Sequence, residues 1–272
     1  MRVLVTGAGG FVGSRVMRML AGQYELHPLP KGMAAGNPDT VLREVARVQP
    51  DIILHTAAIS DTGYCQQHPE ESYRSNVALP LALAKTGVKL VAFSSDQVYT
   101  GLVGSTPFAE DAPLQPTNVY GQHKREMEQR VLDAAPNAVL LRATWMYDFA
   151  GDGLPLRGNL PLNLLHAAQT GEELGFSARD FRGITWVRDA VQNLPAAMQL
   201  PGGVYNFGCE NPLDMWQTAQ EFCEILNVAP KLLRQDWQRC LAMDTAKARR
   251  GGVVFADTVQ AFRQCVEQCR HR

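Results

Sequence analysis

The chain has 272 residues, enough for one large α/β domain or for one domain with a smaller lobe. Hydrophobic residues make up 46% and charged residues 19%, as in soluble globular proteins, and the net charge of −1 argues against nucleic acid as a partner. The longest apolar run, residues 77–84, is too short to span a membrane, and the six cysteines form no C-x-x-C pair and no zinc-finger spacing, so we expect a reduced cytoplasmic protein without a metal site.

The first twenty residues predict a nucleotide-binding turn. Residues 2–6 (RVLVT) form a short apolar run typical of a buried parallel strand, and residues 14–20 continue as a helix. Between them lie Gly7, Gly10 and Gly13. Such a turn must be tight, its backbone must approach a pyrophosphate, and its helix must pack closely on the strand, so glycine is needed at several positions. The order of strand, glycines and helix therefore predicts a dinucleotide site.

Strands and helices are expected to alternate from here on. Further strands are predicted at residues 24–28, 51–55, 89–94 and 138–142, and helices at residues 38–48, 69–86 and about 118–134. The helix at 69–86 is expected to bend at Pro80, and Asn76 in its middle is either buried for structural reasons or helps to place Lys124. This alternation predicts an α/β fold with a Rossmann-type, doubly wound parallel sheet.

Polar and small residues follow the third and fourth predicted strands. Thr56, Ala57 and Ala58 are small enough for the backbone to pass close to a ligand, and Ser95 and Asp96 stand at a carboxyl end, where doubly wound sheets bind their ligands. His55, at the end of the third strand, is interpreted as part of the sheet core rather than as a functional histidine.

Tyr120 and Lys124 lie four residues apart on a predicted helix capped by Thr117 or Asn118, so they share one face. A free tyrosine has a pKa of about 10, and a nearby ammonium favours the phenolate and lowers that pKa. The pair is a candidate general acid/base. The same spacing also occurs on many solvated helices, so the interpretation depends on the motifs upstream.

The pattern loosens after residue 147. Residues 149–158 are rich in glycine and proline and predict a loop, and the remaining segments predict four helices and a strand at 203–207. We predict an NAD(P)-binding domain over residues 1–148 and a smaller, interleaved substrate-binding lobe over residues 149–272, of which residues 182–209 return to the sheet.

Together these segments resemble the extended short-chain dehydrogenase/reductase family and, within it, the dTDP-4-dehydrorhamnose reductase group. The resemblance covers nearly the whole chain. Its markers are TGAGGFVG at 6–13, PDIILHTAA at 50–58, SNVALPLALA at 75–84, FSSDQVYTG at 93–101, FAEDAPLQPTNVYGQHK at 108–124, LLRATWMY at 140–147 and RGITWVRD at 182–189.

The resemblance implies an NAD(P)H-dependent reductase of a 4-keto sugar nucleotide. Ser95 would hydrogen-bond the substrate carbonyl, Tyr120 would protonate the developing alkoxide, and Lys124 would hold the nicotinamide ribose. The other cofactor-binding residues would be Gly7, Ala8, Gly10, Phe11, Val12, Gly13, Thr56, Ala57, Ala58, Asn76 and Ser94. The substrate-binding residues would be Ser60, Asp96, Trp145 and Arg182. The family resemblance also allows a homodimer.

Three other functions occur in proteins of this fold, and individual residues bear on whether this chain has them. Gln97 stands where sugar-nucleotide 4,6-dehydratases carry a glutamate, and an amide cannot act as a carboxylate base, so dehydration is not expected. An epimerase would use the same catalytic residues, and some relatives are cofactor-bound regulatory subunits, such as that of methionine adenosyltransferase. Residues 59–65 (ISDTGYC) lack the usual Val-Asp followed by acidic residues, and residues 236–240 lack an Arg-Pro pair. Both departures concern the identity of the sugar nucleotide.

The second strand indicates the cofactor. NAD-preferring proteins usually carry an acidic residue at its end for the ribose 2′-hydroxyl, but Glu25 lies inside the strand and no acid follows before Asp39. Lys31 can attract a 2′-phosphate, whereas Arg15 on the first helix is expected to face solvent. We therefore predict that NADPH is preferred over NADH, with NAD as the alternative cofactor.

Overall fold

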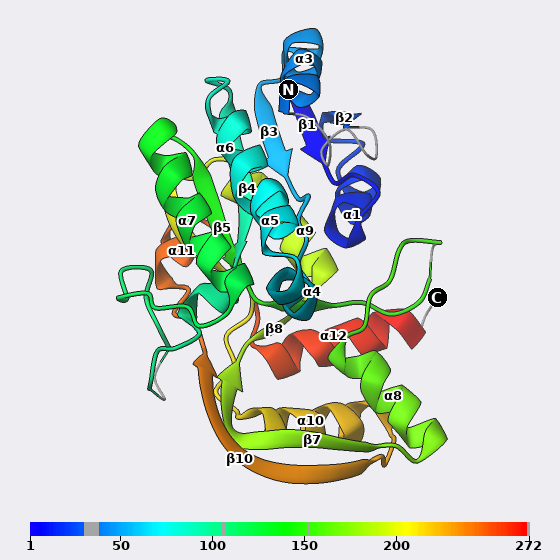
Figure 1. Ribbon diagram of the computed structural model, residues 1–272. Coiled ribbons are helices and arrows are strands. Elements are labelled where there is room, and N and C mark those ends of the chain that lie inside the picture. The colour runs from blue at the N-terminus through cyan, green and yellow to red at the C-terminus, as the bar shows by residue number, and fades with distance from the viewer. Residues whose placement is uncertain (30–37, 105–106, 152, 271–272) are drawn as a thin grey trace.

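The computed structural model describes residues 1–29, 38–104, 107–151 and 153–270 (Figure 1). The strands are β1 (Arg2–Thr6), β2 (Glu25–Pro28), β3 (Ile52–His55), β4 (Lys89–Ser95), β5 (Val139–Ala143), β6 (Trp145–Tyr147), β7 (Glu173–Arg182), β8 (Ile184–Trp186), β9 (Gly203–Phe207) and β10 (Lys231–Leu241). The helices are α1 (Phe11–Met19), α3 (Pro38–Val48), α4 (Thr62–Gln67), α5 (Pro69–Tyr73), the π-helix η1 (Arg74–Ala78), α6 (Leu79–Ala84), the 3-10 helix η2 (Asp96–Tyr99), α7 (Val119–Ala134), α8 (Leu160–Thr170), α9 (Val187–Ala197), α10 (Met215–Leu226), α11 (Ala246–Arg250) and α12 (Thr258–Arg270).

Six strands form one parallel sheet in the order β2-β1-β3-β4-β5-β9. This order confirms the predicted doubly wound fold. Because the strands are parallel, the carboxyl ends of β1, β3, β4 and β5 meet at one edge of the sheet, and the loops that follow them lie side by side. The last strand, β9, lies beside β5 although 60 residues separate Ala143 from Gly203 in the chain.

Successive residues of the strands enter two different cores. Val5 and Leu54 point to the face covered by α1 and α9, whereas Leu4 and Ile53 point to the face covered by α3, α6 and α7. Side chains alternate between the faces of a strand, so a sheet covered on both sides requires continuous apolar runs such as RVLVT. Burial of both faces fixes the sheet edge that carries the site.

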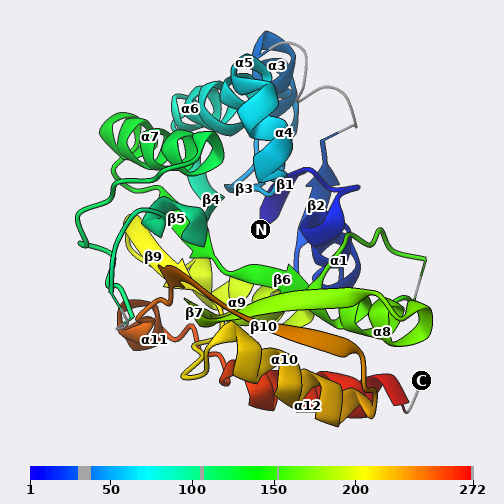
Figure 2. The same cartoon turned by 60° about the horizontal axis from the view of Figure 1, so that its bottom comes forward.

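The C-terminal part adds a second layer beside the large sheet. Strands β7 and β10 form a long, curved parallel ribbon, and the short strands β6 and β8 pair separately (Figures 1 and 2). Helix α10 packs along β7, and α12 lies against α10, where Phe222 and Phe262 stack with ring centroids 3.7 Å apart. The domain boundary at residue 148 stays a prediction.

The segment at residues 69–86 differs from the single bent helix that we expected. It consists of α5, the π-helix η1 and α6, and the N–H of Leu79 donates to the carbonyl of Arg74, five residues earlier. The irregular turn lies directly before Pro80, and the predicted bend at this proline stays a prediction. Pro80 has no N–H to donate to the carbonyl of Asn76, and a π-helical turn accommodates that loss.

Arg15 does not face solvent, contrary to expectation. Its side chain is buried, with Nε 2.9 Å from Asp148 Oδ2 and Nη1 2.7 Å from the carbonyl oxygen of Pro155. The guanidinium therefore ties α1 to the segment at residues 149–158. In the described ranges, no helix combines the length and the apolar character needed to cross a membrane. All six cysteines carry free thiols.

Candidate active site

A cavity of about 860 Å³ opens at the carboxyl edge of the large sheet, between the sheet and the C-terminal layer. Its volume lies in the range of ligand sites in proteins. It brings together fifteen of the predicted site residues: Gly7, Gly10, Phe11, Val12, Thr56, Ala57, Ala58, Ser60, Ser94, Ser95, Asp96, Tyr120, Lys124, Trp145 and Arg182. Ala8, Gly13 and Asn76 are not part of its lining, and Lys31 lies outside the described residues.

The glycine turn is built for close approach. Gly7 has a φ of +68°, which favours glycine, and a Cβ there would lie 2.7 Å from the backbone nitrogen of Ala57. A Cβ at Gly13 would lie 2.1 Å from the carbonyl oxygen of Gly7, so only glycine lets α1 pack this close to β1. Helix α1 begins at Phe11, directly beside the cavity, and its first N–H groups and positive dipole end suit a pyrophosphate.

His55 and Asn76 support the wall of the cavity from behind. His55 is buried, its Nδ1 lies 2.7 Å from Thr6 Oγ1, and burial lowers its pKa to about 3, so the ring is neutral. Asn76 is also buried and donates to the carbonyl of Ile59 and to Ser72 Oγ. These contacts are those of core residues, as expected for His55 and as one of the two interpretations of Asn76 predicts.

Helix α7 presents Tyr120 and Lys124 to the cavity from one face. Asn118 caps the helix, because its side chain accepts a hydrogen bond of 2.7 Å from the N–H of Gly121. Both catalytic candidates are buried, and the Lys124 ammonium lies 5.7 Å from the centre of the Tyr120 ring. The fold thus selects Asn118 from the two expected caps and fixes the first turn of the helix against Ser95.

The electrostatics of Tyr120 differ from the expectation. Its pKa is raised, first because burial disfavours the phenolate and also because Asp96 is near, while a hydrogen bond with Ser95 and the charge of Arg157 lower it. The prediction that Lys124 lowers this pKa is not met. A tyrosine that stays protonated at neutral pH is the form that donates a proton.

Lys124 is the second group whose charge state burial controls. Its ammonium donates to the carbonyl oxygen of Phe93 at 2.9 Å, and burial lowers its pKa from 10.5 to about 8, against the opposing effect of Glu128. The carbonyl oxygen of Phe93 is a single neutral acceptor, and it does not replace the water that the Lys124 ammonium loses on burial. Around pH 7 the side chain still carries its charge.

This lowered pKa makes stability depend on pH. Between about pH 8 and pH 10.5 the unfolded chain binds the Lys124 proton and the folded chain does not, so the free energy of unfolding rises with pH over this window. We expect the unfolding free energy of the wild type minus that of Lys124→Met to increase from pH 8 to pH 10.5, measured by urea denaturation. Groups that titrate in both proteins cancel. A difference that stays flat would show that Lys124 titrates normally.

A buried ion pair holds β4, β5 and α7 together behind the site. Arg142 donates from Nε and Nη2 to the two carboxylate oxygens of Glu128 at 3.0 and 2.7 Å, and Ser94 Oγ donates to the same carboxylate at 2.6 Å. A third nitrogen, Nη1, reaches the hydroxyl of Tyr99. This bidentate arrangement fixes the strand that carries Ser95 against the helix that carries Tyr120.

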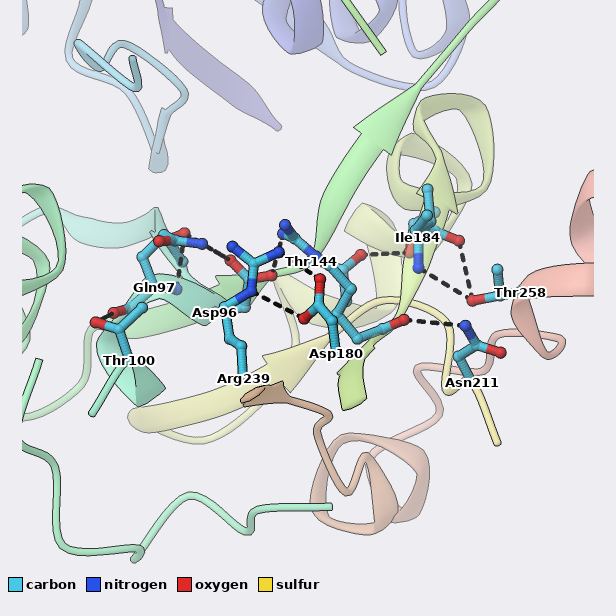
Figure 3. A network of polar contacts seen from close by, with 12 residues as sticks. Asp96, Gln97, Thr100, Thr144, Asp180, Ile184, Asn211, Arg239 and Thr258 are labelled. Carbon is cyan, nitrogen blue, oxygen red and sulfur yellow. Dashed lines mark hydrogen bonds and ion pairs between the residues drawn. The ribbon is translucent and has the colours of Figure 1, made fainter. Parts of the chain in front are cut away.

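The opposite wall of the cavity is formed by charged residues of the C-terminal layer. Figure 3 shows Asp96, Asp180 and Arg239 in one polar network. Asp96 lies 2.5 Å from Arg182, whose guanidinium lies 5.3 Å from the centre of the Trp145 ring, and Arg239 forms two hydrogen bonds with Asp180. Trp145 both lines the cavity and packs against the main core.

Sequence reasoning missed three arginines of the cavity, Arg74, Arg157 and Arg239. Arg157 lies in the glycine- and proline-rich segment and donates to Ser60 Oγ at 2.9 Å, and Arg239 lies in the segment that lacks the Arg-Pro pair. The departure from the family pattern at residues 236–240 was the available signal for Arg239. No local pattern marks Arg157, because its neighbours in the cavity come from distant parts of the chain.

Comparison with known proteins assigns the family. The family model described as the RmlD substrate binding domain matches residues 1–251. The spore coat polysaccharide biosynthesis protein SpsK of Bacillus subtilis is 31% identical over 212 residues, covering 75% of this chain and 72% of SpsK. The dTDP-4-dehydrorhamnose reductase of Burkholderia thailandensis is 29% identical over 203 residues, covering 73% of this chain and 66% of the reductase.

A solved structure shares the fold. The dTDP-4-dehydrorhamnose reductase of Bacillus anthracis, crystallised in complex with NADP, superposes with a TM-score of 0.86 at 20% sequence identity. The superposition covers 98% of this chain and 99% of that one.

Proposed function

The chain belongs to the RmlD family, the dTDP-4-dehydrorhamnose reductase-like group of extended short-chain dehydrogenases/reductases, and from this premise we propose that it reduces a 4-keto sugar nucleotide with NAD(P)H. One observation carries the proposal. Ser95, Tyr120 and Lys124 line the same cavity as the glycine turn, so a proton donor and a dinucleotide site face one space. A reductase of the family's kind needs that combination.

The residues at the amino-terminal side of the cavity fit a dinucleotide. The turn at Gly7 and Gly10 and the first residues of α1 would hold the pyrophosphate, and Lys124 would donate to the nicotinamide ribose. A Cβ at Gly7 would meet the backbone of Ala57 and one at Gly13 the backbone of Gly7, so the turn keeps its tight shape only with glycine at these positions. When bound, the cofactor supplies the hydride that reduces the ketone.

The side chains of this protein would then donate the proton and stabilise the negative charge that develops. As negative charge develops on the carbonyl oxygen, the Tyr120 phenol donates its proton and the Ser95 hydroxyl stabilises the oxygen. The raised pKa of Tyr120 keeps the phenol protonated before the reaction. The hydrogen bond with Ser95 and the charge of Arg157, which both lower the pKa of Tyr120, stabilise the phenolate that remains.

The side chains on the opposite side of the cavity are suited to bind an anionic substrate that carries a sugar. Arg157, Arg182 and Arg239 all line it, and guanidinium groups are well suited to diphosphate oxygens. The names of the reductases in the comparison point to dTDP-4-dehydrorhamnose as the first compound to test.

The test follows NADPH consumption with dTDP-4-dehydrorhamnose and with UDP-linked 4-keto sugars, with identification of the product by mass spectrometry. We expect one NADPH to be consumed for each alcohol formed. Ketone conversion without loss of NADPH would contradict a reductase, as would tight cofactor binding without any conversion. Sedimentation of the same sample decides the oligomeric state, since a homodimer stays a prediction.

We predict that NADPH binds about tenfold more tightly than NADH, or ~1.4 kcal/mol. In the register of the sheet, Glu25 on β2 stands opposite Arg2 at the start of β1. This is the end of the strand far from Gly7, so Glu25 cannot contact the adenosine ribose. The sequence has no Asp or Glu between Glu25 and Asp39 that could repel a 2′-phosphate there, and Lys31 would attract it.

Fluorescence titration of both cofactors measures this preference. Lys31→Ala should weaken NADPH binding and spare NADH, whereas Lys85→Ala, which removes an exposed lysine after α6, should change neither. The account of the preference fails if NADH binds more tightly or if Lys31→Ala leaves the NADPH affinity unchanged.

Trp145→Ala is expected to raise the Kd for the sugar nucleotide about tenfold and to leave the Kd for NADPH nearly unchanged. The indole is half-buried at the cavity and offers a flat apolar surface to a sugar ring beside Arg182. Calorimetric titration measures both constants. Trp216→Ala on α10, outside the lining of the cavity, is the control for loss of an indole. Equal loss of both affinities with a lower melting temperature would assign Trp145 to the core instead.

A further inference from the structure

Four side chains of alternating charge lie at the side of the cavity next to the C-terminal layer: Asp96, Arg182 and Arg239 line it, and Asp180 pairs with Arg239. Asp180 and Arg182 are two residues apart on β7, so they leave the strand on the same face. Arg239 stands opposite Asp180 in the register of β10. Asp96 comes from the other layer, directly after β4. These side chains therefore join the substrate side of the molecule to the strand that carries Ser95 (Figure 3).

The two oxygens of Asp96 have different partners. Oδ2 lies 2.5 Å from Nη2 of Arg182, whereas Oδ1 accepts from Ser95 Oγ at 3.1 Å and from the side chain of Gln97 at 3.4 Å. Asp96 is only 2% exposed, so its charge depends on these contacts in place of water. The direction of the Ser95 hydroxyl hydrogen is consequently set by a carboxylate whose nearest cation is Arg182.

Arg182 has a donor left over. Its Nε is buried and has no hydrogen-bond partner among the described residues, although the side chain lines the cavity and is 10% exposed. A buried N–H without an acceptor is costly and rare. An oxygen of a molecule bound in the cavity is the acceptor that this geometry lacks.

We propose that Arg182 is a positioning and specificity residue: its Nε binds an oxygen of the substrate, and its Nη2 holds Asp96, which orients the hydroxyl of Ser95. This inference rests on the proposed function for the identity of the substrate. The guanidinium is planar and rigid, so an acceptor at Nε and a carboxylate at Nη2 fix one another's positions. Recognition of the sugar nucleotide and alignment of Ser95 are thereby linked through one side chain.

Lysine and methionine at position 182 separate the two roles. Lysine restores a cation next to Asp96 but cannot reproduce two donors in a fork, whereas methionine leaves Asp96 without its nearest cation and with a stronger hold on the Ser95 hydrogen. With NADPH and dTDP-4-dehydrorhamnose as the probe, we expect Arg182→Met to lower kcat and raise KM, each about tenfold. Arg182→Lys should recover kcat to within about threefold of wild type and keep the raised KM.

A purely structural role would give a different result. Arg182→Lys and Arg182→Met would then lower kcat together with the melting temperature, without separating kcat from KM. Equal kcat values for the two variants would overturn the link to Ser95. A wild-type KM in Arg182→Lys would overturn the contact from Nε.

A second measurement tests the link without turnover. Ser95 and Arg182 both contact Asp96, so the effects of Ser95→Ala and Arg182→Met on the free energy of unfolding should be non-additive in wild type and additive in an Asp96→Asn background. Arg249→Met, which breaks the Arg249–Glu210 pair outside the cavity, should be additive with Ser95→Ala in both.

Additivity of Ser95→Ala and Arg182→Met in wild type would overturn the proposal, and Arg182→Gln takes the place of Arg182→Met if that variant does not fold. A wild type that consumes no NADPH with any sugar nucleotide would refute the proposed function, while this cycle still decides whether Asp96 links Arg182 to Ser95.

Discussion

Replacing Tyr120 with phenylalanine is expected to lower kcat by ~10²–10⁴-fold and to leave the Kd for NADPH nearly unchanged. The variant keeps the ring that packs in the cavity wall and loses only the hydroxyl that lies against Ser95. In the proposed reaction no other group at this position can donate the proton to the alkoxide. Steady-state kinetics and fluorescence titration on the same sample measure the two quantities.

Tyr205→Phe is the matched control for this change. Its hydroxyl donates to the carbonyl of Pro201, and Tyr205 is not part of the cavity lining, so its loss should cost about 1 kcal/mol of stability and leave kcat intact. A Tyr120→Phe variant with wild-type kcat would remove Tyr120 from the mechanism.

Arg142→Met is expected to lower the free energy of unfolding by about 3–5 kcal/mol. The Glu128 carboxylate is buried and would lose both hydrogen bonds and its cation, keeping only the bond from Ser94. Breaking a buried pair from one side costs more than the pair itself contributes, because the remaining charge is uncompensated. Urea denaturation at pH 7 measures the loss.

The double variant Glu128→Gln/Arg142→Met separates the cost of an unpaired charge from the loss of packing. With both members of the pair made neutral, we expect much of the lost stability to return, because neither Glu128 nor Arg142 is left as a charge without its partner. A double variant that is as unstable as Arg142→Met would assign the loss to packing of the Arg142 side chain against Tyr99. A single variant with wild-type stability would show that this pair does not hold β5 to α7.

The sequence alone predicted those features that depend only on residues close to one another in the chain. The glycines of the first turn follow β1 directly, and Tyr120 and Lys124 share a face because the helical period alone places them there. The continuous apolar strands indicated a sheet covered on both faces, and the parallel order confirms it. These features depend on neighbours within about one helical turn or one strand.

Features that depend on contacts between residues far apart in the chain could not be predicted from the sequence. Arg15 is buried because Asp148, 133 residues later, neutralises it, and nothing in the first helix signals that contact. Arg157 enters the cavity through a segment without periodicity. The spacing of Tyr120 and Lys124 indicated a nearby cation but not the burial of both groups, and burial determines the direction of the Tyr120 pKa.

The central claim is that this chain transfers a hydride to a carbonyl carbon of a sugar nucleotide and that Tyr120 supplies the proton. The most direct test uses NADPH carrying deuterium at the nicotinamide carbon that donates hydride, with dTDP-4-dehydrorhamnose as the acceptor and mass spectrometry of the product. We predict one deuterium on the former carbonyl carbon with the wild type, and loss of this product with Tyr120→Phe. A product without deuterium, formed while NADPH stays unconsumed, would contradict the account and indicate an isomerisation instead.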